Sequence, residues 1–160
     1  MEGASGVKGP GKYTVDPSME AKDIASEVLI NGKYVKNPTA QNMNDLIKPG
    51  YNYVGSKQMN GQYMYVIDQE GKIIIGTRGK DLATGENLHM PHPTLIGGEN
   101  PIVQGAGMVE IRGGKIYSID NASGHFKPDA SSLGAAKEAF EKLPQNVFHK
   151  DFQGYISIVD

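Results

Sequence analysis

Hydrophobic and polar positions alternate through the middle of the chain and recur at helical spacing towards both ends. The segments QYMYVI and KIIIGTR flank the turn DQEG, and β-branched and aromatic side chains dominate both segments. This pattern predicts a β-hairpin whose turn places Gly71 at positive φ. The segments GMVEI and KIYSI flank RGG in the same way and predict a second hairpin. Two such hairpins favour an antiparallel sheet with one face buried.

Helical spacing first appears near the N-terminus. Residues 17–30 have apolar side chains at loosely helical intervals, and Ser18 is the expected N-cap. A second, shorter helix is predicted over residues 37–50, with Pro38 near its start and Pro49-Gly50 at its end.

The third predicted helix covers residues 129–144. Alanine and lysine favour a helix there, Ser131 or Ser132 can cap it, and Pro144 ends it. One face of this helix should pack on the sheet, namely the face that carries Leu133, Ala136, Phe140 and Leu143.

Two further strands and a domain boundary complete the pattern. Residues 31–35 are expected to form a turn followed by a short strand, and residues 154–159 a last strand. Residues 1–16 have the glycine, lysine and proline content of a linker, as in a domain cut from a larger protein. We therefore expect one α+β domain over residues 17–160, an antiparallel sheet built from β-hairpins with about three helices packed on it.

Composition narrows the functional classes. A formal net charge of -2 counts against a protein that binds duplex DNA tightly. The absence of cysteine excludes disulfides, thiolate zinc sites, iron–sulfur clusters and a cysteine nucleophile. No apolar run reaches the length of a membrane span, so no membrane partner is expected. The 21 glycines in 160 residues predict many turns or close backbone approaches.

Residues 90–128 carry the candidate chemistry. His92 stands between two prolines, which restrict the backbone on both sides of it. Glycines at 97–98 and at 105 and 107 allow close approach of another strand or a ligand. The run Ser123-Gly124-His125-Phe126-Lys127-Pro128 follows the second hairpin, and we expect it to present His125 in a fixed, exposed place at a strand end.

Four motifs in this order, HPTLIGG, GAG, GGKIYSID and SGHFKP, resemble the C-terminal toxin domains of bacterial polymorphic toxins, including Rhs-type proteins. The resemblance covers roughly residues 62–155. A looser version of the pattern is similar to the core of plant IQ-motif calmodulin-binding proteins. Nothing in the chain resembles an IQ helix, so calmodulin is not expected as a partner.

The toxin resemblance implies a secreted effector, delivered as part of a larger toxin, that acts in the cytoplasm of a rival bacterial cell. It also implies a cognate immunity protein as partner. The resemblance does not determine the chemical reaction, which has to be argued from the residues themselves.

The leading hypothesis is a metal-independent ribonuclease that uses the 2′-hydroxyl of RNA as nucleophile. His92 and His125 would serve as general base and general acid, and Lys127 would stabilise the charge on the phosphorane. No cofactor is needed for this chemistry. Four further residues are candidates for substrate binding: Ser123, Arg78, Lys150 and Tyr117.

Two alternatives remain open. An NAD-dependent ADP-ribosyltransferase would use NAD as cofactor, with Arg78, Ser123, His125 and Glu110 in its site. A non-enzymatic module would use the glycine-rich segment to bind a partner. No metal site is expected, because His89 and His92 could be joined only by Glu86 or Glu99 in a loop. The second functional histidine could be His149 in place of His92.

Overall fold

Six strands form the central sheet of the computed structural model, which describes residues 12–48, 50, 52–78 and 90–158. Its strand order is β10-β9-β8-β5-β6-β4. The bounds are β4 Gln41–Asn42, β5 Gly61–Ile67, β6 Ile73–Gly76, β8 Gly105–Arg112, β9 Lys115–Asp120 and β10 Tyr155–Ile156. All neighbours are antiparallel except β9 and β10, which are parallel. Together with the three α-helices of the described residues, this is an α+β fold, as the sequence predicts.

Both predicted hairpins are confirmed. Strands β5 and β6 pair around a turn in which Gly71 has a φ of 82°. Strands β8 and β9 pair around Gly113 and Gly114, with φ of 59° and 76°. Left-handed backbone is what a tight hairpin turn requires, and glycine adopts it without a Cβ clash.

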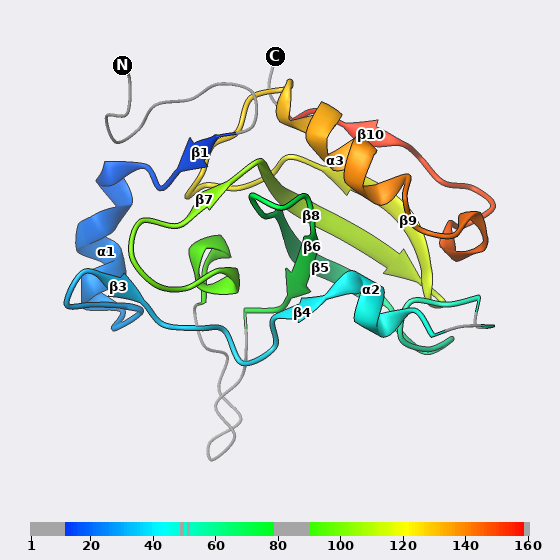
Figure 1. The fold of residues 1–160 in the computed structure, drawn as a ribbon, viewed down its shortest axis with the longest axis horizontal. Coiled ribbons are helices and arrows are strands. Elements are labelled where there is room, and N and C mark those ends of the chain that lie inside the picture. Colours follow the sequence, from blue (N-terminus) through cyan, green and yellow to red (C-terminus); the bar gives the residue numbers. More distant parts are fainter. Residues whose placement is uncertain (1–11, 49, 51, 79–89, 159–160) are drawn as a thin grey trace.

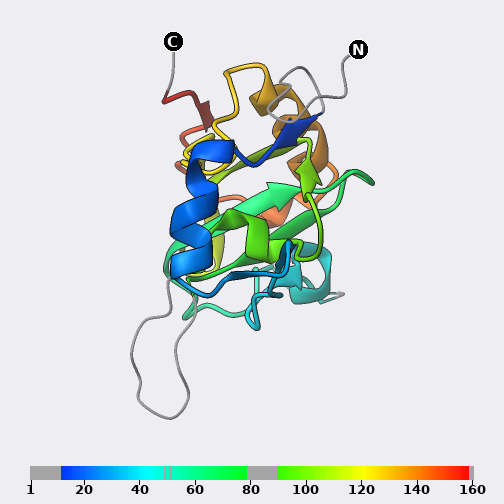
Figure 2. The ribbon, with the colours of Figure 1, turned by 90° about the vertical axis from the view of Figure 1, so that its left-hand side faces the viewer.

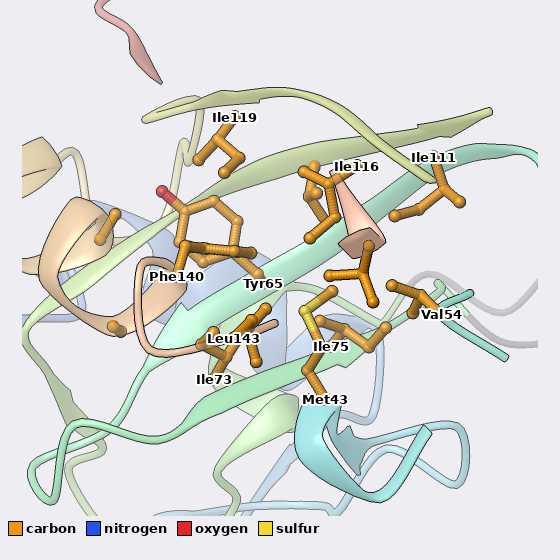
Figure 3. Close-up of a cluster of buried hydrophobic side chains, with 14 of the residues drawn as sticks. Met43, Val54, Tyr65, Ile73, Ile75, Ile111, Ile116, Ile119, Phe140 and Leu143 are labelled. Carbon is orange, nitrogen blue, oxygen red and sulfur yellow. The ribbon is translucent and has the colours of Figure 1, made fainter. Parts of the chain in front are cut away.

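One core fills the face of the sheet that α3 (Ser132–Phe140) covers (Figure 1). Figure 3 shows Phe140 beside Tyr65, and their rings meet edge to face at 5.4 Å between centroids. Helix α2 (Met43–Leu46) and the turn η3 (Gln145–Val147) add to the same core. Ala136, Phe140 and Leu143 are buried there as predicted, whereas Leu133 is only partly buried.

A second core lies on the opposite face of the sheet. The short helix η2 (His92–Leu95) and strand β7 (Ile102–Val103) cover this face, together with Phe126. Strand β1 (Tyr13–Thr14) pairs with β7 and buries Tyr13 completely. The folded part of the chain therefore includes residues 12–16, which the sequence analysis assigned to a linker.

The first predicted helix is shorter than expected. Asp16 caps a turn of 3-10 helix, η1 (Pro17–Met19), because its side chain accepts a hydrogen bond from the Ser18 amide; Ser18 is not the cap. The helix α1 follows over Glu20–Ala25 and ends before Glu27, whose φ is 62°. The remaining residues form the hairpin of β2 (Leu29–Ile30) and β3 (Lys33–Tyr34). Figure 2 shows α1 running along one side of the molecule.

Two other predicted elements also differ. The helix expected over residues 37–50 is reduced to α2, because residues 41–42 pair with β6 as strand β4. Asn37 is buried and hydrogen-bonds to the Thr77 carbonyl, which ties residues 37–40 to the end of β6 and prevents a helical start. The strand expected over residues 154–159 is limited to β10 and pairs in parallel with β9.

Candidate functional site

The loop that follows β9 holds His125, and it is anchored at several points. Oδ1 of Asp120 accepts hydrogen bonds from the Met108 and Ala122 amides, which fixes the end of the strand. Farther on, the Ser123 hydroxyl accepts from the Phe126 amide, and the Phe126 ring is fully buried in the second core. These contacts hold the turn that contains His125 in one conformation.

The environment of His125 corrects the sequence analysis. His125 lies five residues beyond β9, and its side chain is 11% exposed, so it is neither at a strand end nor on the open surface. The Nε2 atom of His125 lies 2.9 Å from Oδ1 of Asp23, which is 3% exposed. A carboxylate only accepts hydrogen bonds, so Nε2 donates and the Nδ1 atom is left as the proton-accepting nitrogen of the neutral ring.

Asp23 has a second partner. The Tyr34 hydroxyl donates to Oδ2 of Asp23, while His125 uses Oδ1, so both carboxylate oxygens are engaged. Burial raises the pKa of Tyr34, and the adjacent Asp23 carboxylate raises it further. A histidine that is oriented by a buried carboxylate has a fixed tautomer and a fixed ring orientation.

Lys127 lies beside this pair in an unusual backbone conformation. Its φ is 45°, a left-handed value that costs a residue with a side chain about 1–2 kcal/mol. The Lys127 Nζ lies 2.6 Å from Oδ2 of Asp16, and the hydrogen bond with Lys127 holds the pKa of Asp16 well below its usual range. The Asp16 amide also donates to the His125 carbonyl at 2.7 Å. The N-terminal segment is thus tied directly to the His125 turn.

His92 begins η2 and is buried, with 5% exposure. Its Nε2 donates to the Gly107 carbonyl at 2.8 Å. Burial lowers the pKa of His92 to about 4, and the hydrogen bond to Gly107 only partly offsets this effect. His92 is therefore neutral at pH 7 and offers Nδ1 as a hydrogen-bond or proton acceptor.

A pocket of about 660 Å³ brings these residues together. His92, His125 and Lys127 all line it, and Lys22 of α1 and Arg78 beyond β6 contribute two more cations. No carboxylate is found among the described residues of the lining. Apolar walls come from Met19, Pro91, Met108, Pro128 and Ile158. Three cations around one concavity favour an anionic ligand, and the two histidines supply acid–base groups.

The other predicted site residues divide into two groups. Ser123 and Arg78 line the pocket, as does His125. Tyr117 and Lys150 do not, and neither does His149, whose ring meets Tyr117 edge to face at 5.2 Å. Glu110, considered for NAD chemistry, also lies outside the pocket lining and contacts Arg112.

The expected glycine contact is found between two strands. A Cβ atom on Gly107 would lie 1.9 Å from the carbonyl oxygen of Asp120, so only glycine allows this approach. Gly107 therefore fixes the distance between β8 and the start of the His125 loop, and its own carbonyl holds His92.

No group of three potential metal ligands occurs within the described ranges of the chain. His89 and Glu86, considered as ligands with His92, lie outside those ranges. Among the helices that the structure describes, none has the length and apolar character to cross a membrane.

Four residues of the site are not evident from the sequence: Asp16, Lys22, Asp23 and Tyr34. Asp23 is the most important of them, because it is the partner of His125 from 102 positions away. In the sequence, Asp23 is an acidic residue within a predicted helix, and such residues usually lie on a solvated surface. Only its burial in the folded chain indicates its role.

Comparisons with known protein families, with curated proteins and with solved structures find no match for this chain. The similarity to toxin domains therefore depends on the four motifs alone.

Proposed function

We propose that this domain is a metal-independent ribonuclease of the polymorphic-toxin type. The observation that carries the proposal is His125, which is hydrogen-bonded to the buried Asp23 and lines the same cation-rich pocket as the neutral His92. Acid–base chemistry needs one group that can accept a proton and another that can donate one, and distinct environments separate the two roles.

In the proposed reaction His92, neutral because of its burial, accepts the proton of the ribose 2′-hydroxyl at Nδ1. The 2′-oxygen attacks the phosphorus and the bond to the 5′-oxygen breaks. His125, oriented by Asp23 through Nε2, donates in its protonated form the Nδ1 proton that the leaving 5′-oxygen needs. The products are a 2′,3′-cyclic phosphate and a 5′-hydroxyl, so atoms and charge balance without a co-reactant.

The cations of the pocket have separate tasks. Lys127 is nearest in sequence to His125, and its amine would meet the charge that develops on the phosphoryl oxygens. Lys22 and Arg78 would hold the phosphates of the RNA, and the Ser123 side chain would contact the substrate. The site requires no cofactor for this reaction.

The remaining features of the proposal come from the motif resemblance. We infer a secreted or delivered domain that acts in the cytoplasm of a target bacterium and that is neutralised by an immunity protein. An immunity protein that covers the pocket would block both histidines at once.

The test is incubation of the purified domain with total RNA in the presence of a chelator, followed by analysis of fragment lengths. Wild-type protein should shorten the RNA, and His125→Gln should lose about 10²–10⁴-fold in rate while its thermal unfolding stays close to that of the wild type. Unchanged cleavage by His125→Gln would overturn the assignment. Intact RNA with the wild type would overturn the ribonuclease proposal, and labelled NAD with a cell lysate would then test ADP-ribosyl transfer, for which Arg78, Ser123 and His125 share the pocket.

A further inference from the structure

The face of the central sheet that carries the second core extends beyond the pocket, and no helix among the described residues covers it there. The second core covers Met64, Val66 and Ala106 on this face. Towards the turn between β8 and β9, the side chains on the same face are partly or fully exposed. We call this surface the open strip, and it consists of Gln62, Glu110, Arg112, Tyr117 and Ser118.

The strand register places these side chains on one face. Val109 and Ile111 of β8 point into the first core, so Met108, Glu110 and Arg112 point to the opposite face. Gln62 and Ser118 pair with Glu110 on its two sides. The open strip therefore continues the surface of Met108, which lines the pocket.

A β-bulge adds Tyr117 to the strip. Glu110 pairs with Ser118 and Ile111 with Ile116, so Tyr117 is the extra residue of β9. This insertion lets both Ile116 and Ile119 enter the first core, and it directs the Tyr117 ring towards Arg112.

Arg112 is held from two directions. Its guanidinium carbon lies 3.6 Å from the centroid of the Tyr117 ring, and its Nε donates to Glu110 at 2.7 Å. The Arg112 side chain nevertheless remains 51% exposed. A planar guanidinium that is fixed on one face and open on the other can stack on a base and donate to phosphate with little loss of rotamer entropy.

We propose that the open strip binds a nucleotide of single-stranded RNA that lies beyond the two nucleosides flanking the scissile phosphate, with Arg112 as its anchor. This inference rests on the proposed ribonuclease function for the position of the scissile bond. Arg112 lies four positions beyond Met108 on β8, a distance of about 13 Å along the strand. The outer plane of the Arg112 guanidinium, supported by the Tyr117 ring beneath it, is a surface on which a base of single-stranded RNA can stack.

The length dependence of cleavage tests this proposal. Arg112→Ala should lower kcat/KM for a ten-nucleotide RNA by about tenfold, because one stacked nucleotide is lost. Cleavage of a dinucleotide, which is too short to reach Arg112, should not change. Lys72→Ala is the matched control, because it removes an exposed, acid-paired cation from the turn at the other end of the sheet. Equal effects of Arg112→Ala on both substrates, or no effect on either, would overturn the proposal.

Binding separates this inference from the proposed reaction. A fluorescent ten-nucleotide RNA with 2′-O-methyl groups cannot be cleaved by 2′-hydroxyl attack, so its affinity reports binding alone. Arg112→Ala should weaken this affinity about tenfold, Arg112→Lys should restore only part of it, and Lys72→Ala should not change it. If the wild type binds this RNA more tightly than Arg112→Ala does but cleaves no substrate, the ribonuclease proposal is wrong and RNA binding by the open strip is supported. If the wild type does not bind this RNA, or binds it no more tightly than Arg112→Ala does, the proposal that the open strip binds RNA is wrong. A protein partner then becomes the alternative occupant of the strip.

Discussion

The Nε2 atom of His125 lies 2.9 Å from Oδ1 of Asp23, although 102 positions of sequence separate the two residues. The Tyr34 hydroxyl occupies the other oxygen of the carboxylate. Asp23 comes from α1, Tyr34 from the hairpin that follows, and His125 from the loop beyond β9. The acid–base group is therefore assembled from both ends of the chain.

Replacement of Asp23 tests whether this contact orients His125. Asp23→Asn keeps the size of the side chain but removes the negative charge that lies against the His125 ring. We expect kcat/KM for RNA to fall about 10²-fold while substrate affinity changes little. Steady-state cleavage of a short RNA measures both quantities.

Tyr34→Phe is the control for that experiment, because it removes a hydrogen bond to Asp23 and leaves the contact with His125 in place. It should reduce the rate less than Asp23→Asn does. A fully active Asp23→Asn enzyme would show that His125 does not depend on the carboxylate.

The burial of His92 should make stability depend on pH. Its pKa is lowered from 6.5 to about 4 in the folded protein, so the unfolded chain takes up a proton that the native state does not bind. The free energy of unfolding should therefore be unaffected by His92 protonation above pH 6.5. It should fall as the pH drops from 6.5 towards 4, by about 3 kcal/mol at most. Urea unfolding of the wild type and of His92→Gln, at pH 7.5 and at pH 4.5, measures it. The variant should lose less stability between the two pH values, and an identical loss would contradict the burial of a neutral His92.

Replacement of two glycines near the site by alanine should change the stability of the protein to very different extents. Gly107→Ala places its Cβ 1.9 Å from the Asp120 carbonyl oxygen, so β8 and β9 must move apart, and we expect a loss of several kcal/mol in unfolding free energy. Gly124→Ala, directly before His125, meets nothing within 4 Å and should fold with a change of less than about 1 kcal/mol. Denaturant unfolding compares the two variants, and equal stabilities would contradict the close approach at Gly107.

Lys127 allows its backbone and its charge to be tested separately. Lys127→Gly and Lys127→Ala both remove the amine, but only glycine is relaxed at a φ of 45°. The glycine variant should be about 1 kcal/mol more stable than the alanine variant, because the left-handed conformation no longer carries a steric cost. Both variants should lose RNA cleavage to the same extent if the amine stabilises the transition state. Full activity in either variant would remove Lys127 from the mechanism.

The parts of the fold that the sequence predicts well are those determined by neighbouring residues. The hairpins follow from alternating apolar positions around Gly71 and around Gly113–Gly114, and both turns have the left-handed backbone that these glycines allow. The helix α3 follows from its alanine content and from the face that carries Ala136 and Phe140. Each of these signals is contained within a few residues of the element that it specifies.

The parts that the sequence does not predict depend on distant contacts. The helix predicted over residues 17–30 ends early because Leu29 and Ile30 pair with β3. The helix predicted from residue 37 does not start there because Asn37 hydrogen-bonds to the Thr77 carbonyl. In the site, local sequence identifies His125 and Lys127 but not Asp23, because nothing near Asp23 indicates that it is buried. The expected exposure of His125 is wrong for the same reason, since Asp23 and Tyr34 come from the other end of the chain.

The chemical ends of the RNA fragments test the mechanism most directly. The purified domain would be incubated with a defined single-stranded RNA in excess chelator, and the fragments would be identified by mass. Attack by the 2′-hydroxyl, with His92 and His125 as base and acid, predicts fragments that end in a 2′,3′-cyclic phosphate and begin with a 5′-hydroxyl. Fragments with 5′-phosphate and 3′-hydroxyl ends, or no fragments at all, would contradict it.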